Sequence, residues 1–149
     1  MFNDRTINQQ PIRATQHPIE SLQPLFTVKV HAGFPSPATD YLEPSLDLNA
    51  HLVPNKSATF FFTVAGDSMS GAGILDGDRV VVDRSVDAEH NHIVIAIYNN
   101  EYTLKRLYKF AGVIELRPEN PAFNSIRMEE GDELVIWGVV VGVIRKLRV

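Results

Sequence analysis

The stretch TFFFTVA (residues 59–65) followed by GDSM (66–69) predicts both the fold class and a candidate site. The first segment is mostly aromatic and β-branched, a composition that predicts a β-strand. Gly66 permits a tight turn at the end of that strand, and Ser68 follows in the turn. A serine in such a turn can project its hydroxyl, with neighbouring main-chain N–H groups free to form an oxyanion hole. Strand–turn segments with glycine and serine are common, so this pattern alone also fits an ordinary turn.

The rest of the chain after residue 58 also has a composition typical of β-strands. Five further segments combine β-branched and aromatic residues and are bounded by turn signals: 79–83, 92–98, 101–107, 113–117 and 134–148. Asn99 and Asn100 separate two of them, and asparagine tolerates the positive φ of a two-residue hairpin turn. Short strands of this kind predict a mostly β domain of antiparallel strands. We find no amphipathic helix pair, so a helix-turn-helix DNA reader is not supported.

The first 57 residues differ, since they carry seven of the nine prolines. Proline removes a main-chain donor and fixes φ, which disfavours long helices and central strands. We expect an extended N-terminal arm, with residues 1–20 as a disordered tail. Within the arm, residues 25–30 (LFTVKV) form a short apolar piece, and residues 41–52 suit a short helix or turn.

Composition narrows the classes of function. A chain of 149 residues suits one domain, and the absence of cysteine excludes disulfides, zinc–thiolate sites, iron–sulfur clusters and a cysteine nucleophile. The net charge of −4 and a pI near 5.7 argue against nucleic acid as the main partner. No apolar run is long enough to span a bilayer, and residues 1–4 do not begin a secretory signal, so we expect a cytoplasmic protein.

A serine nucleophile needs a base, and the sequence offers two kinds. The histidines lie outside any triad context: His17, His31, His51, His90 and His92. His90 and His92 have the spacing of a metal-ligand pair, but no further ligand cluster accompanies them, and a turn before a strand explains them. The other candidate is Lys105, which strand alternation places on one face with Thr103 and Leu107 while Arg106 points away. The ordinary interpretation of such a lysine is a solvated strand residue.

Three segments taken together resemble the LexA/UmuD family of self-cleaving serine–lysine peptidases: 66–69 (GDSM), 76–78 (DGD) and 103–107 (TLKRL). The 37-residue separation of Ser68 and Lys105 agrees with the serine-to-lysine spacing of that family. The resemblance runs from about residue 25 to 149, is closest to UmuD-like members, and includes residues 32–38 (AGFPSPA) and 40–41 (DY).

The resemblance implies a catalytic domain of antiparallel strands in which Ser68 is the nucleophile and Lys105 the general base. It implies no cofactor and no metal. Lysine has an ordinary pKa of about 10.4, so a working base here must be made neutral, and burial against apolar strands lowers a lysine pKa by up to about 3–5 units. The main-chain N–H groups of Ser68 and Met69 would form the oxyanion hole.

The family also implies a substrate, which is the chain's own arm. The cut would fall between Ala32 and Gly33, dividing the chain into a removable arm, 1–32, and a peptidase domain, 33–149. UmuD-like proteins often have cysteine before this glycine, where this chain has Ala32. The arm is long enough to reach its own Ser68 or that of a partner, and we expect it to bind as an extra strand beside the site.

The partners implied are those of the SOS response. The RecA–single-stranded DNA filament would stimulate self-cleavage. The shortened homodimer would then serve a UmuC-like Y-family polymerase subunit in translesion synthesis, without specific DNA binding of its own. A weaker resemblance, at Gln23, Leu25 and Phe26, is to the segments by which polymerase partners dock on the sliding clamp.

The sequence leaves two alternative functions open. One is a LexA or phage-type transcriptional repressor, which carries a DNA-binding domain of a size that the residues before the proposed cut do not provide. The other is a non-catalytic interaction module of the same fold. A signal peptidase shares the serine–lysine chemistry but needs a membrane anchor.

Overall fold

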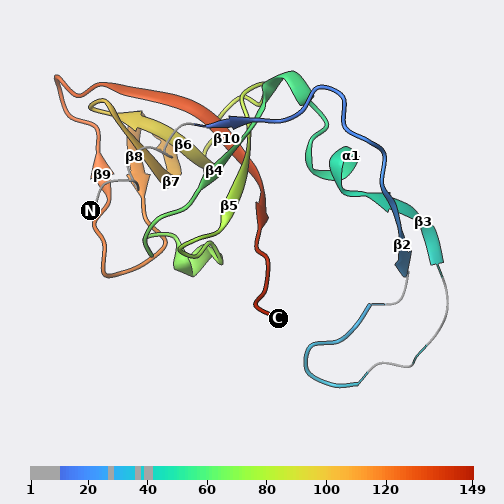
Figure 1. The fold of residues 1–149 in the computed structure, drawn as a ribbon. Coiled ribbons are helices and arrows are strands. Elements are labelled where there is room, and N and C mark those ends of the chain that lie inside the picture. Colours follow the sequence, from blue (N-terminus) through green and yellow to red (C-terminus); the bar gives the residue numbers. More distant parts are fainter. Residues whose placement is uncertain (1–10, 27–28, 36–37, 39–41) are drawn as a thin grey trace, which may run out of the picture.

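Strands dominate the computed structural model, which describes residues 11–26, 29–35, 38 and 42–149. Figure 1 shows one large sheet and a separate strand pair carried by the N-terminal segment. The large sheet has eight strands in the order β1-β4-β5-β10-β6-β7-β8-β9, and β2 pairs with β3 in the small one. All of these pairings are antiparallel, so the predicted fold class is confirmed.

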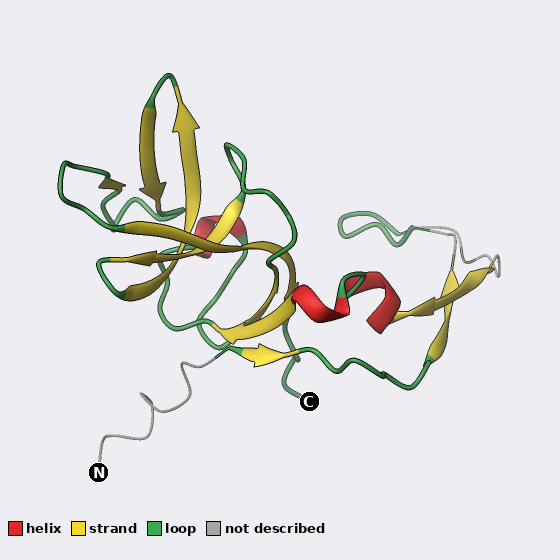
Figure 2. Cartoon of the chain, turned by 90° about the horizontal axis from the view of Figure 1, so that it is seen from above, coloured by secondary structure: helices red, strands yellow, loops and turns green. Residues whose placement is uncertain are grey.

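The elements have the following bounds: β1 Ile12–Arg13, β2 Leu22–Phe26, β3 Leu42–Asp47, α1 Leu48–Leu52, η1 Lys56–Ala58, β4 Thr59–Thr63, η2 Ser70–Ala72, β5 Arg79–Asp83, β6 Ile93–Tyr98, β7 Glu101–Phe110, β8 Val113–Arg117, β9 Ile126–Arg127 and β10 Leu134–Ile144. In Figure 2 the helices are short turns between strands. No helix among the described residues is long and apolar enough to cross a membrane.

Most strands from residue 59 onward lie where the sequence predicts them. Asn99 and Asn100 have φ values of 46° and 68° and make the turn between β6 and β7 as expected. The differences are the unpredicted two-residue strand β9 and the ends of two other strands. β7 continues to Phe110, and β10 ends at Ile144 instead of continuing to residue 148. The next residue, Arg145, directs its side chain to a buried carboxylate, Asp78.

The N-terminal arm requires a correction. Residues 1–10 lie outside the described residues, but the expectation of a disordered tail is wrong for residues 12–14. Ile12 and Arg13 pair with Phe61 and Phe60 of β4, and Ala14 is 6% exposed. The reason is that β4 would otherwise present an unpaired edge, and a two-residue strand is too short to leave a periodic pattern in the sequence.

The described residues between 22 and 52 also form more regular structure than predicted. β2 pairs with β3, whereas the sequence suggested only a short apolar piece and a helix or turn. The predicted helix is confirmed for α1 alone, where the Asp47 side chain accepts from the N–H of Asn49 at 2.9 Å. Of the apolar piece, Leu25 and Phe26 belong to β2, and Val30 is 90% exposed. Val28, Asp40 and Tyr41 lie outside the described residues.

Two apolar clusters form the core on opposite faces of the sheet, because neighbouring strand residues point to opposite sides. One contains Val64, Met69, Ile74, Val80, Val82 and Ile95. The other contains Val94, Ala96, Leu107, Leu116 and Val139. Met69 immediately follows Ser68, and fully burying such a side chain stabilises by roughly 1.5–3 kcal/mol. Its burial therefore anchors the turn in which Ser68 lies.

Candidate active site

The turn that carries Ser68 begins where β4 ends. The N–H of Val64 donates to the carbonyl oxygen of Asp78 at 2.7 Å, so the chain is still held beside the start of β5. Gly66 then has a φ of 89°, a value that side-chain-bearing residues rarely adopt, and its N–H donates to the Asp76 carboxylate at 2.7 Å. The chain therefore leaves the sheet at Gly66. Ser68 is half-buried, and Met69 is 1% exposed.

A second loop clamps this turn from the other side. The N–H of Glu119 donates to the carbonyl oxygen of Ser68 at 2.8 Å, and the N–H of Gly71 donates to the carbonyl oxygen of Glu119 at 2.7 Å. The Asn120 side-chain amide donates to the carbonyl oxygen of Asp67 at 2.9 Å. Three main-chain groups around Ser68 are thus fixed by two residues of one loop, which we call the 119–120 clamp.

Sequence reasoning missed the 119–120 clamp. The loop is flanked by Pro118 and Pro121, which predict a turn but give no partner for it. Glu119 also forms an ion pair with Arg106, the residue after Lys105 on β7. The clamp therefore joins the serine turn to the strand that carries the lysine.

Lys105 reaches Ser68 from β7. Its Nζ donates to Ser68 Oγ at 3.1 Å, to Thr103 Oγ1 at 3.1 Å and to the carbonyl oxygen of Leu104 at 3.0 Å. Lys105 and Thr103 share a face, as strand alternation predicts. Burial removes water from the ammonium group and thereby lowers the pKa of Lys105 below its ordinary 10.5. Among the described residues no carboxylate forms an ion pair with Lys105 that would oppose this effect.

This arrangement suits proton abstraction. A protonated lysine has three N–H bonds, which match the three acceptors around Nζ. A neutral lysine keeps two N–H bonds, which Thr103 and Leu104 can still accept, and its lone pair then faces the Ser68 hydroxyl. Thr103 and Leu104 thus orient the amine, and the site can convert a serine hydroxyl into a nucleophile.

The site opens into a cleft of about 210 Å³ between the end of β4 and the start of β7. It is lined by residues 62–66, 68, 69, 80, 95 and 102–105. Within the described part of the chain, the N–H groups of Ser68 and Met69 donate to no protein acceptor, so both can bind an oxyanion. The residues named as a possible oxyanion hole therefore lie beside the Ser68 hydroxyl.

The proposed cleavage site is not in this cleft. Ala32 and Gly33 are exposed and lie in the connection between β2 and β3, which stands away from the large sheet in both Figure 1 and Figure 2. In the described part of the arm, the strand that joins the sheet is β1, which pairs with Phe60 and Phe61 of β4 and not with the Ser68 turn. Gln23, Leu25 and Phe26 are part of β2 instead, where they pair with β3.

The two histidines considered as metal ligands have ordinary structural roles. His90 Nδ1 accepts from the N–H of Lys109 at 3.0 Å, and His92 Nδ1 accepts from the N–H of Glu89 at 3.1 Å. Among the residues that the structure describes, no three histidine, aspartate or glutamate side chains are grouped to hold a metal ion.

Comparison with known proteins identifies the family of the chain. Residues 24–141 match the family model described as Peptidase S24-like. Protein SamA of Salmonella typhimurium is 46% identical over 133 residues, covering 89% of this chain and 92% of that protein. Protein MucA of Escherichia coli is 43% identical over 118 residues, covering 78% of this chain and 80% of that protein.

A repressor is also similar, but over less of its length. The LexA repressor of Syntrophotalea carbinolica is 51% identical over 89 residues, which are 60% of this chain and 44% of the repressor. The family match covers most of the chain and includes both Ser68 and Lys105. The chain therefore belongs to the Peptidase S24-like family, the LexA/UmuD group of self-cleaving serine peptidases.

Proposed function

We propose that Ser68 and Lys105 form the catalytic dyad of a self-cleavage reaction at the Ala32–Gly33 bond. The observation that carries this proposal is the 3.1 Å separation of Lys105 Nζ and Ser68 Oγ at a site where burial lowers the pKa of the lysine. A serine nucleophile is activated when its hydroxyl lies within hydrogen-bond distance of a base and further groups orient that base.

The reaction has two stages. Neutral Lys105 takes the proton of the Ser68 hydroxyl while Oγ attacks the carbonyl carbon of Ala32, and the N–H groups of Ser68 and Met69 bind the oxyanion. The C–N bond to Gly33 then breaks, and the Lys105 ammonium gives its proton to the departing amine. Water, activated by the same lysine, hydrolyses the acyl ester and restores the Ser68 hydroxyl.

The exposed position of Ala32 and Gly33 adds a requirement. The segment must leave its place between β2 and β3 and enter the cleft, in its own chain or in a second copy. Small residues on both sides of the bond suit a cleft of about 210 Å³. Mixing a labelled Ser68→Ala chain with unlabelled wild-type chain distinguishes the routes, because only cleavage between chains cuts the labelled one.

The biological function that follows is that of a UmuD-like accessory protein of SOS mutagenesis, which acts after self-cleavage. The finer assignments belong to the proposal: stimulation by the RecA–single-stranded DNA filament, a homodimer of residues 33–149, and a UmuC-like Y-family polymerase partner in the cytoplasm. Docking on the sliding clamp through Gln23, Leu25 and Phe26 would require β2 to separate from β3.

The test is incubation of the purified chain at alkaline pH, alone and with activated RecA filament, followed by mass spectrometry. We expect two fragments that meet at Ala32–Gly33. Ser68→Ala and Lys105→Ala should each slow their formation by at least about 10⁴-fold. Ser57→Ala and Lys109→Ala change an exposed serine and an exposed lysine outside the cleft and should leave the rate unchanged. Wild-type chain that stays intact under both conditions would refute the proposal.

A further inference from the structure

The N-terminal arm is bound to the large sheet by contacts that the proposed cut does not touch. β1 is the edge strand of that sheet, with Ile12 opposite Phe61 and Arg13 opposite Phe60. The N–H of Ala14 extends the pairing by donating to the carbonyl oxygen of Thr59 at 2.9 Å. These contacts join residues on the two sides of the Ala32–Gly33 bond.

Side chains add to this attachment. The guanidinium carbon of Arg13 lies 5.5 Å from the centre of the Phe60 ring, within the range of a cation–π contact. Ala14 is 6% exposed, whereas Ile12 is 65% exposed, so the arm is packed against the domain at the small residue and not at the large one. The edge of the sheet therefore binds an extended segment that has a cation, Arg13, followed by a small residue, Ala14.

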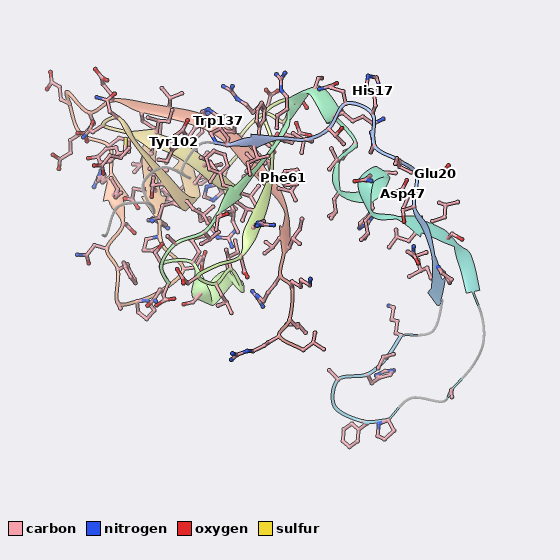
Figure 3. All side chains as sticks on the ribbon, in the orientation of Figure 1. His17, Glu20, Asp47, Phe61, Tyr102 and Trp137 are labelled. Carbon is pink, nitrogen blue, oxygen red and sulfur yellow. The ribbon has the colours of Figure 1, made fainter. Side chains whose placement is uncertain are left out.

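Beyond β1, the arm closes one side of a small cavity of about 70 Å³. Three lining residues come from the arm: Ala14, Thr15 and Pro18. Four come from the other side of the proposed cut: Asn49, Val53, Lys56 and Phe61. Figure 3 shows the arm leaving the sheet near Phe61, passing His17 and Glu20, and running towards the strand that carries Asp47.

A second pairing crosses the cut as well. β2 lies before the bond and β3 after it, and they are paired from Leu22 opposite Asp47 to Phe26 opposite Leu42. Breaking the Ala32–Gly33 bond converts the connection between these strands into two free ends but removes none of their main-chain hydrogen bonds.

We infer that cleavage does not by itself release the arm, because the β4 edge and the adjoining cavity are a binding site for residues 11–18 of the severed fragment. This inference rests on the proposed cleavage at Ala32–Gly33. The first product is a complex of fragments 1–32 and 33–149 without a covalent link. Dissociation of the arm is a separate step, and it uncovers the aromatic edge of β4. Before the cut the arm is held at a high effective concentration, and afterwards only its own affinity retains it.

The experiment separates retention of the arm from self-cleavage. A Ser68→Ala chain with an N-terminal affinity tag receives a foreign protease recognition sequence in the exposed segment 29–35, where insertions are tolerated. After digestion under native conditions the tag is captured, and the retained material is weighed by mass spectrometry. We expect fragment 33–149 to be captured together with the tagged arm.

Two variants carry the same added charge in different surroundings. Ala14→Glu places a carboxylate at a buried position and should lower the captured fraction of 33–149 by at least about tenfold. Ile19→Glu places it at a residue that is 88% exposed and should leave capture unchanged. A synthetic peptide of residues 11–26 should displace the tagged arm, while the same peptide with Ala14→Glu should not, a comparison that does not depend on how a variant chain folds.

Each outcome bears on one of the two proposals. The inference about the arm is wrong if the chain without Ala14→Glu loses fragment 33–149 from the resin as completely as the Ala14→Glu chain does. That conclusion holds whether or not the wild-type chain cleaves itself. Retention in the foreign-protease experiment, with no self-cleavage in wild-type chain, would refute the proposed dyad and support the binding site.

Discussion

Lys105 Nζ lies 3.1 Å from Ser68 Oγ, although 37 residues separate the two along the chain. They come from different parts of the fold, one from the turn after β4 and the other from β7. The 119–120 clamp connects these parts, because Glu119 binds the main chain of Ser68 and forms an ion pair with Arg106. This relationship leads to the predictions that follow.

The rate of self-cleavage should rise with pH. Burial lowers the pKa of Lys105, so the neutral amine becomes abundant below the ordinary value of 10.5, and the half-maximal rate should occur below pH 10.5. Lys105→Arg retains a positive charge that does not dissociate and should be inactive at every pH. The measurement is the initial rate of fragment formation from pH 6 to 11. A rate independent of pH would contradict the assignment of Lys105 as the base.

The same pKa shift predicts how Lys105 affects stability. The folded pKa lies below the unfolded value, so the unfolded chain binds more protons between them, and this group's contribution to the free energy of unfolding rises with pH through that window. Urea unfolding of Ser68→Ala and of the Ser68→Ala, Lys105→Met double variant, both uncleaved, measures it. The free energy of unfolding of the Ser68→Ala chain, minus that of the double variant, should increase as pH rises. Parallel pH profiles of the two free energies would contradict the prediction.

Asn120→Ala should slow cleavage more than it destabilises the chain. It removes the hydrogen bond to the carbonyl oxygen of Asp67 and the exposed one that Asn120 Oδ1 accepts from the N–H of Ala122, and a typical hydrogen bond contributes about 1 kcal/mol or less to stability. A small displacement of Ser68 from Lys105 is costly, and we expect a loss of about tenfold or more in rate. Urea unfolding and fragment formation measure the two effects.

Asn55→Ala is the matched control for this change. Asn55 donates to the buried carboxylate of Asp83 at 2.8 Å, away from the cleft. The control should lose stability and keep its rate at a temperature where it is folded. Equal rate losses in the Asn55 and Asn120 variants would mean that the effect is general destabilisation.

Gly71→Ala should be far more damaging than Gly73→Ala. A Cβ at Gly71 would lie 2.4 Å from the carbonyl oxygen of Glu119, so the 119–120 clamp would have to move away from the Ser68 turn. A Cβ at Gly73 meets nothing within 4 Å, and its cost is only the strain of a φ of 78°, about 1–2 kcal/mol. Melting temperature and cleavage rate should both fall further for the Gly71 variant. The reverse order would contradict the role given to the clamp.

The ion pair of Asp78 and Arg145 should make stability fall in acid. Asp78 is 2% exposed and accepts two hydrogen bonds from Arg145, each 2.6 Å long. These bonds, together with a weaker contribution from the N–H of Leu75, which donates to the same carboxylate at 2.8 Å, lower the pKa of Asp78 from 3.8 to about 2. Because the folded pKa is the lower one, this contribution is complete above about pH 4 and is lost as pH falls towards 2.

Arg145→Ala tests this prediction. The variant should melt several degrees below wild type at neutral pH, and the difference should shrink between pH 4 and pH 2. Glu115→Gln removes the more exposed ion pair with Arg117, leaves Arg117 over the Tyr108 ring, and should change the melting temperature little at any pH. A constant difference between Arg145→Ala and wild type across the acid range would contradict the assignment.

The sequence predicts every strand from residue 59 onward except β9, because each of the others is long enough to show its composition and is bounded by a turn signal. The strands it misses are short or depend on a distant partner. β1 and β9 have two residues each, and β3 is paired with β2 in a region whose prolines argued against strands. No local pattern reveals such pairings, because their stability comes from a partner elsewhere in the chain.

The identity of the dyad could be proposed from sequence through the family motifs, and the face shared by Lys105 and Thr103 followed from strand alternation. The sequence by itself thus determined the β class, the absence of cysteine chemistry, and the residues able to act as nucleophile and base. Tertiary structure alone decided that their atoms lie within hydrogen-bond distance, that burial shifts the lysine towards its neutral form, and that Glu119 and Asn120 fix the serine turn. It also decided that the arm pairs with β4. The physical reason is that desolvation and hydrogen bonding depend on what is close in space, and the fold brings together residues that the sequence keeps far apart.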